Sequence, residues 1–87
     1  MTKKELCIRI KISDGFSPKN LNLRHTLEDT ITERGLGHIW DSSNGVDFME
    51  VNLDCVPKKK IIGEIKNILS SLGLLSQSYF RFYDVEG

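Results

Sequence analysis

Apolar and polar residues alternate near the start of the chain, in the stretch ELCIRIKIS at residues 5–13. The apolar positions are Leu6, Ile8, Ile10 and Ile12. A period of two is typical of a strand with one buried face. The same reasoning predicts three more strands, which are a short HIW at 38–40, FMEVNLDCV at 48–56 and QSYFRFYDV at 77–85.

After Asn22 the apolar period lengthens to four, which is typical of one face of a helix. The apolar positions are Leu23, Leu27 and Ile31. Asn20 or Asn22 is expected to cap the start of this helix, because a short polar side chain accepts a backbone hydrogen bond there. Gly35 or Gly37 is expected to end it.

A second helix is predicted after Pro57, a residue that suits the first turn of a helix. Its apolar stripe is the clearest in the chain and consists of Ile61, Ile62, Ile65, Ile68, Leu69 and Leu72. Gly73 is expected to end it. Lys58, Lys59 and Lys60 crowd its first turn, where they form either a solvated charge run or a corner that attracts anions.

The predicted order is strand, helix, strand, strand, helix, strand, and each element has one apolar face. We therefore expect an α+β fold in a single domain, residues 1–87, with one four-stranded antiparallel sheet and both helices on one face. The ferredoxin-like βαββαβ arrangement fits this order best. Residues 41–47, DSSNGVD, are expected to form a loop around the Asn44–Gly45 turn.

Composition narrows the choice of partners. The chain has 12 basic and 12 acidic residues, and this balance disfavours nucleic acid as a partner. No apolar run reaches the ~20 residues of a membrane helix, so we expect a cytoplasmic protein that is not membrane-bound. Cys7 and Cys55 fall on opposite faces of the predicted sheet, without a CxxC motif, so we expect no disulfide, no metal site and no cofactor.

The face of the sheet that carries no helix is the candidate site, because aromatic and acidic residues gather there. The residues expected to bind a partner are Trp40, Asp41, Asp47, Glu50, Asp54, Tyr79, Arg81 and Tyr83. Aromatic residues and arginine are the types that anchor protein interfaces. The alternative is an ordinary solvated face, on which Arg9 or Lys11 forms a cross-strand ion pair with Glu50 or Asp54.

Three other functions use the same topology. RNA-recognition motifs stack bases on strand aromatics, but NGVDFMEV at 44–51 lacks most of their pattern and adds carboxylates. Acylphosphatases have a similar strand-loop-strand segment, but Asp41 stands near the position of their catalytic asparagine, and DGFSPKNLNLRHT at 14–26 lacks their phosphate-binding run although it contains Arg24. ACT-like modules bind amino acids near the corresponding loop, with which Gly15 is compatible. We therefore expect a protein that is not an enzyme, either monomeric or homodimeric.

Residues 21–74 resemble small bacterial immunity proteins of toxin–immunity systems, including contact-dependent inhibition and polymorphic toxin systems. The resemblance lies in a helix start, in a serine-containing hairpin at 41–47 that has fewer glycines than those relatives, and in a helix rich in isoleucine and leucine that closes at Gly73. The residues of the helix start are Leu23, Arg24, Leu27, Glu28 and Asp29.

This resemblance implies inhibition by binding. An immunity protein occludes the active site of one cognate toxin, often a nuclease with a basic cleft. The acidic residues of the open face would then mimic phosphate charge and speed association. These are Asp41, Asp47, Glu50 and Asp54. Trp40, together with Tyr79 or Tyr83, would anchor the toxin.

Overall fold

A computed structural model describes residues 3–55 and 59–85 of the chain. Its elements follow the predicted order, and their bounds are β1 Lys3–Lys11, α1 Pro18–Glu33, β2 His38–Asn44, β3 Phe48–Cys55, α2 Lys59–Ser71, a 3-10 turn Leu75–Gln77 and β4 Ser78–Val85. The four strands form one antiparallel sheet in the order β2-β3-β1-β4. This confirms the predicted α+β class, with a four-stranded antiparallel sheet and two helices.

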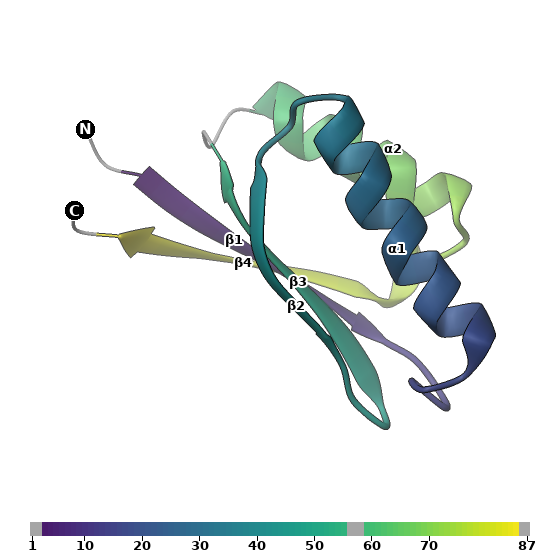
Figure 1. The fold of residues 1–87 in the computed structure, drawn as a ribbon. Coiled ribbons are helices and arrows are strands. Elements are labelled where there is room, and N and C mark those ends of the chain that lie inside the picture. The colour runs from purple at the N-terminus through teal and green to yellow at the C-terminus, as the bar shows by residue number, and fades with distance from the viewer. Residues whose placement is uncertain (1–2, 56–58, 86–87) are drawn as a thin grey trace.

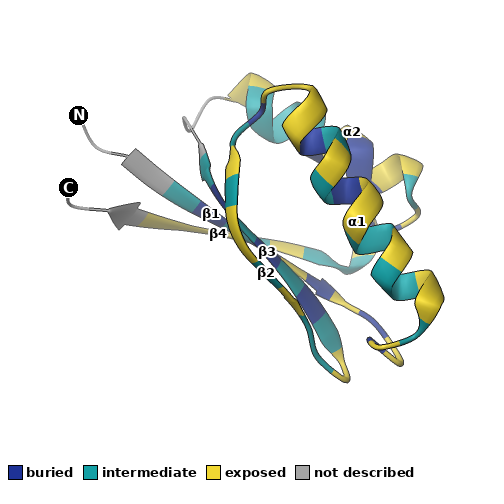
Figure 2. Cartoon of the chain, in the orientation of Figure 1, coloured by how far each residue is buried: buried dark blue, intermediate teal, exposed yellow. Residues whose placement is uncertain are grey.

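Both helices lie against the same face of the sheet and leave the other face open (Figure 1). The core between the two layers comes from alternate positions of the two central strands and from one stripe of each helix (Figure 2). Its fully buried side chains are Leu6, Ile8, Ile10, Leu27, Ile31, Met49, Val51, Leu53, Ile65 and Leu69. Each contributes about 1.5–3 kcal/mol through burial, so this layer holds the sheet in place behind the open face.

The start of α1 differs from the prediction. The helix begins at Pro18, and the hydroxyl oxygen of Ser17 caps it by accepting a hydrogen bond from the Asn20 backbone N–H at 3.2 Å. The Asn20 side chain instead donates to the carbonyl oxygens of Ser13 and Asp14, at 3.0 and 2.9 Å. Asn20 therefore ties the preceding loop to the helix. At the other end Gly35 adopts a φ of 64°, which confirms it as the predicted glycine stop.

Strand β2 is longer than predicted. Residues 41–44 continue the strand to Asn44 instead of forming a loop, and only 45–47 make the turn. The small polar side chains of this segment suggested a loop, but Ser42 and Asn44 alternate inward and find hydrogen-bond partners on α1 and the loop before it. Tertiary contacts thus override the local preference of these residues for turns.

The two phenylalanines of strand β4 differ in how far they are covered. Phe80 and Phe82 both lie on the helix side of the sheet, but Phe80 packs against the core whereas Phe82 is 40% exposed. Phe82 pairs with the fully buried Leu6, so it is the outermost residue of its row on the helix side of the sheet.

Two sequence predictions fall partly outside the described residues. Pro57 and Lys58 are not described, while Lys59 and Lys60 are exposed at the start of α2. Cys7 has a free thiol on the open face, but the side chain of Cys55 is not described. Within residues 3–55 and 59–85, neither helix is long and apolar enough to cross a membrane.

Candidate binding face

Strand pairing arranges the open face in three rows that cross the sheet from β2 to β4. The rows are His38–Asp54–Glu5–Tyr83, Asp41–Asn52–Cys7–Arg81 and Ser43–Glu50–Arg9–Tyr79. The positions between these rows on β1 and β3 are the buried core residues, so the row positions point away from the helices. Every strand therefore contributes to the candidate surface.

Trp40 occupies an irregularity in β2. Ile39 pairs with Leu53 and Asp41 pairs with Asn52, which leaves Trp40 as an extra residue without a partner on β3. Such a bulge increases the local twist and redirects side chains at the strand edge. Trp40 is 51% exposed, so the largest side chain of the chain remains accessible at the β2 edge of the open face.

Arg9 organises the centre of the face. Its guanidinium carbon lies 3.8 Å from the centroid of the Phe48 ring, and its Nε lies 3.8 Å from a carboxylate oxygen of Glu50. This is one of the cross-strand ion pairs expected under the alternative of an ordinary solvated face. The Arg9 guanidinium covers one side of the Phe48 ring in a cation–π contact, and Phe48 is only partly exposed.

The β4 edge of the face carries the most exposed aromatics. Tyr79 is 61% exposed and Tyr83 is 45% exposed. Arg81 lies between them along the strand, and a hydrogen bond with Tyr83 raises the pKa of its guanidinium above the ordinary value. Like any arginine, Arg81 carries a positive charge, which here lies between two tyrosines.

The predicted partner-binding residues lie on one face but do not converge on one point. Trp40 and Asp41 are on the β2 edge, Glu50 and Asp54 are on β3, and Asp47 is in the β2–β3 turn. The residues on β4 are Tyr79, Arg81 and Tyr83. Three strand spacings of ~4.8 Å separate the two edges, so the surface is about 14 Å wide and suits a macromolecule better than a small ligand.

Charge divides this face in two. The β2–β3 half carries Asp41, Asp47, Glu50 and Asp54. The β1–β4 half carries Arg9, Lys11 and Arg81, with Glu5 as its acidic member among the described side chains. The sequence showed the acids and the aromatics, but the separation of acidic from basic residues across the sheet became visible only once the strand order was known.

Two hollows lie between the two halves of the face, around Arg9. One, of about 360 Å³, is lined by Arg9, Lys11, Asp47, Phe48 and Tyr79. The other, of about 370 Å³, is lined by Cys7, Arg9, Glu50, Tyr79, Phe80, Arg81 and Tyr83. Both can receive a side chain of a partner, and Tyr79 is common to their walls.

Cys7 is one of the residues that line the second hollow. Burial raises the pKa of its thiol above the ordinary value, and the Glu50 carboxylate raises it further, against smaller opposing effects of Arg9 and Arg81. The neutral thiol is therefore favoured, and a thiol of this kind is a poor nucleophile.

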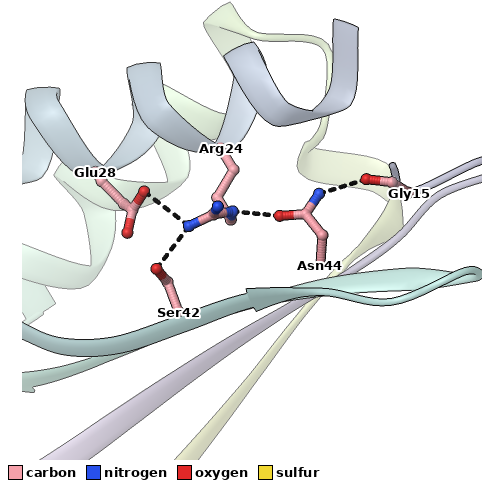
Figure 3. Close-up of polar contacts among 5 residues, drawn as sticks. All are labelled: Gly15, Arg24, Glu28, Ser42 and Asn44. Carbon is pink, nitrogen blue, oxygen red and sulfur yellow. Dashed lines mark hydrogen bonds and ion pairs between the residues drawn. The ribbon is translucent and has the colours of Figure 1, made fainter. Parts of the chain in front are cut away.

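A polar cluster that sequence reasoning missed lies on the helix side of β2 (Figure 3). Arg24 of α1 donates to Glu28 at 3.1 Å, to the Ser42 hydroxyl at 2.6 Å and to the side-chain oxygen of Asn44. Asn44 in turn donates to the Gly15 carbonyl oxygen at 2.6 Å. The spacing of Arg24 and Glu28 by four residues was the visible signal, but their β2 partners are distant in sequence.

The loop between β1 and α1 packs against the β2–β3 turn. The backbone N–H groups of Ile12 and Gly15 donate to the carbonyl oxygens of Asp47 and Val46, at 2.9 and 3.1 Å. A Cβ at Gly15 would lie 1.7 Å from the Gly45 carbonyl oxygen, so only glycine permits this approach. The conformation of this loop is therefore set by the hairpin.

Among the described residues, no group of three or more histidine, cysteine, aspartate or glutamate side chains is arranged to hold a metal ion. No protein-family model matches the chain, and no curated protein is significantly similar to it in sequence.

Proposed function

We propose that this chain is a non-enzymatic, cytoplasmic protein-binding module with a ferredoxin-like fold, and that it neutralises a cognate bacterial toxin by covering the toxin's active site. The single observation that carries the proposal is the open sheet face, where Trp40, Tyr79 and Tyr83 are 51%, 61% and 45% exposed. Exposed aromatics beside arginine are the side chains that supply most of the binding energy at protein interfaces.

The division of charge supports an orientation for the partner. The acidic β2–β3 half faces a basic surface, as expected for the cleft of a nuclease toxin, and the aromatic anchors lie at both edges of the face, Trp40 on β2 and Tyr79 and Tyr83 on β4. Charge of opposite sign accelerates association, while buried aromatics slow dissociation. The acidic residues and the aromatic anchors therefore have separate kinetic roles.

The Arg24 cluster supports binding rather than catalysis of the acylphosphatase type. A phosphate-binding arginine needs donors that face the substrate, whereas Arg24 is 14% exposed and directs its donors to Glu28, Ser42 and Asn44. In the loop before α1, the N–H groups of Ile12 and Gly15 already donate to the hairpin. Arg24 and these two backbone donors are therefore already used within the fold.

The same face argues against RNA as the partner. Phe48 is covered by the Arg9 guanidinium, so its ring is not free to stack a base on that side. On β1, Cys7, which pairs with Asn52, occupies the position where a second stacking aromatic would be needed. The carboxylates of the β2–β3 half would repel phosphates.

The test begins with the partner captured by the tagged chain from its source cells. That partner must arrest growth when expressed alone and must be neutralised by co-expression of this chain. Trp40→Ala should then weaken binding by about tenfold or more and reduce protection, because the indole is an exposed anchor. Phe16→Ala is the matched control, since Phe16 is 60% exposed on the loop before α1, outside the open face.

Full protection by Trp40→Ala at wild-type affinity would contradict the role of this face. A captured partner that is harmless alone, or that is a nucleic acid, would contradict the proposed function itself. Association rates measured with Asp54→Asn should fall mainly at low salt, because this substitution removes charge without removing an anchor.

A further inference from the structure

The two edges of the sheet differ in how they are protected. Edge strand β2 carries the bulge at Trp40, and bulges at edges prevent further strand pairing. Edge strand β4 pairs with β1 through eight consecutive positions, from Lys3 with Val85 to Ile10 with Ser78. Its outer edge is therefore regular and able to accept another strand.

Strand β4 also exposes aromatic side chains on both faces of the sheet. Tyr79 and Tyr83 are exposed on the open face, and Phe82 is 40% exposed on the helix side. The row that ends at Phe82 contains Leu53 and Leu6, which are both fully buried. The apolar layer between sheet and helices thus reaches the edge of the molecule and is left uncovered at Phe82.

We propose that β4 pairs antiparallel with β4 of a second copy of this chain, around a two-fold axis beside Phe82, to form a continuous eight-stranded sheet. Because the axis is perpendicular to the sheet, the helices of both copies lie on one side and the open faces on the other. The pairing goes beyond the proposed function and leaves the open face accessible, with the two β4 strands at its centre.

Side-chain chemistry selects the register. With Phe82 opposite Phe82 of the second copy, Arg81 stands opposite Tyr83, and this pair occurs twice by symmetry. The aromatic pair and the two arginine–tyrosine pairs are all favourable across strands. A register centred on Arg81 would place two guanidinium groups directly opposite each other, which is destabilising.

A second copy fits this edge because the strand is complementary to itself. The register pairs the positive charge of each strand with an aromatic ring of the other and brings no like charges face to face. The chain has 12 basic and 12 acidic residues, so there is no net repulsion between copies. Docking of Phe82 against its symmetry mate would also extend the core across the junction.

Sedimentation velocity across the micromolar range tests the proposal. The wild-type chain should sediment as a dimer, and Phe82→Lys should raise the dimer dissociation constant by about 30-fold or more. Phe82→Glu should do the same, and an equimolar mixture of the two variants should recover the dimer, because opposite charges then meet at the axis. Phe16→Lys is the control for adding a lysine at an exposed phenylalanine, and it should remain dimeric.

Three results would overturn the proposal: a monomeric wild type at every concentration, an undisturbed Phe82→Lys dimer, or a mixture that stays monomeric. A dimer that resists Phe82→Lys but dissociates with Trp40→Ala would be joined face to face instead. Circular dichroism checks that the variants fold. If both charged variants lose the helical signal, a cross-linking experiment replaces the sedimentation test. Phe82→Cys is made in a background where Cys7 and Cys55 are serine, and the protein is treated with a short bismaleimide. Cross-linked dimer is expected there, and its absence counts against the proposal.

Discussion

Arg24 and Arg9 lie on opposite sides of the sheet and use the same guanidinium group differently. Arg24, 14% exposed, spreads its donors over Glu28, Ser42 and Asn44 between α1 and β2. Arg9, 52% exposed, lies over the Phe48 ring with Glu50 at 3.8 Å. The first arrangement satisfies the group inside the fold, and the second leaves about half of the side chain available to water or a partner.

The difference indicates that Arg24 contributes more to the stability of the fold, whereas Arg9 contributes to the properties of the open face. Several charge-assisted hydrogen bonds in a partly buried site stabilise a fold far more than one exposed ion pair does. The two residues should therefore separate cleanly in experiments on stability.

The largest effect is expected from Arg24→Leu. This substitution removes the hydrogen bonds that Arg24 donates to three side chains, and it leaves the partly buried Glu28 carboxylate without its cation. The free energy of unfolding should therefore fall by roughly 2–3 kcal/mol. Urea denaturation followed by circular dichroism measures the loss. Arg34→Leu, at the exposed end of α1, is the control and should change stability little. Equal losses in the two variants would erase the distinction.

A smaller effect is expected from Arg9→Ala. Loss of one exposed ion pair and one cation–π contact should lower the free energy of unfolding by less than about 1 kcal/mol, and less in high salt. Arg9→Lys keeps the charge while weakening the stacking, so it separates the two contributions. A loss as large as that of Arg24→Leu would place Arg9 among the residues that hold the fold.

The smallest effect concerns Cys7, which reports the electrostatics of the same face. Burial and then Glu50 raise the pKa of its thiol, so the folded state favours the neutral form. The associated stability is present below the ordinary thiol pKa and is lost as pH rises through the raised value. In a Cys55→Ser background, alkylation of Cys7 should therefore accelerate only above the ordinary thiol range.

Second substitutions sharpen this measurement. Glu50→Gln should lower the pH at which Cys7 reacts, because it removes a negative charge that opposes the thiolate. Arg9→Ala should raise that pH, because it removes a positive charge. A reaction profile typical of an unperturbed thiol, insensitive to both changes, would mean that the open face is solvated like bulk water.

Elements with strong periodicity were predictable from the sequence, and the bulge was not. The alternation in β1 and the stripe of α2 both correspond to buried residues, because one face of each must pack against the other layer. The predicted strand ended at Trp40, whereas β2 continues to Asn44. Ser and Asn favour turns locally, but here Arg24, which is distant in sequence, donates hydrogen bonds to Ser42 and Asn44.

The candidate face was predictable as a set of residues but not as an arrangement. Strand parity placed Trp40 and the β4 tyrosines outward, and their exposure agrees with this. The pairing of Arg9 with Glu50 was one of several options, and only the register selects it. The exposure of Phe82 depends on where α2 stops covering β4, which periodicity within one strand does not encode.

The position of β1 has a consequence for how the chain folds. This central strand pairs on one side with β3 and on the other with β4, and Leu6 meets Phe82 almost the full length of the chain away. Contacts so distant in sequence require large loops to close before any of their energy is gained, which slows folding. Until β4 docks, one edge of β1 is open next to its isoleucines, so the pairing of β1 with β4 also ends the exposure of that edge to aggregation.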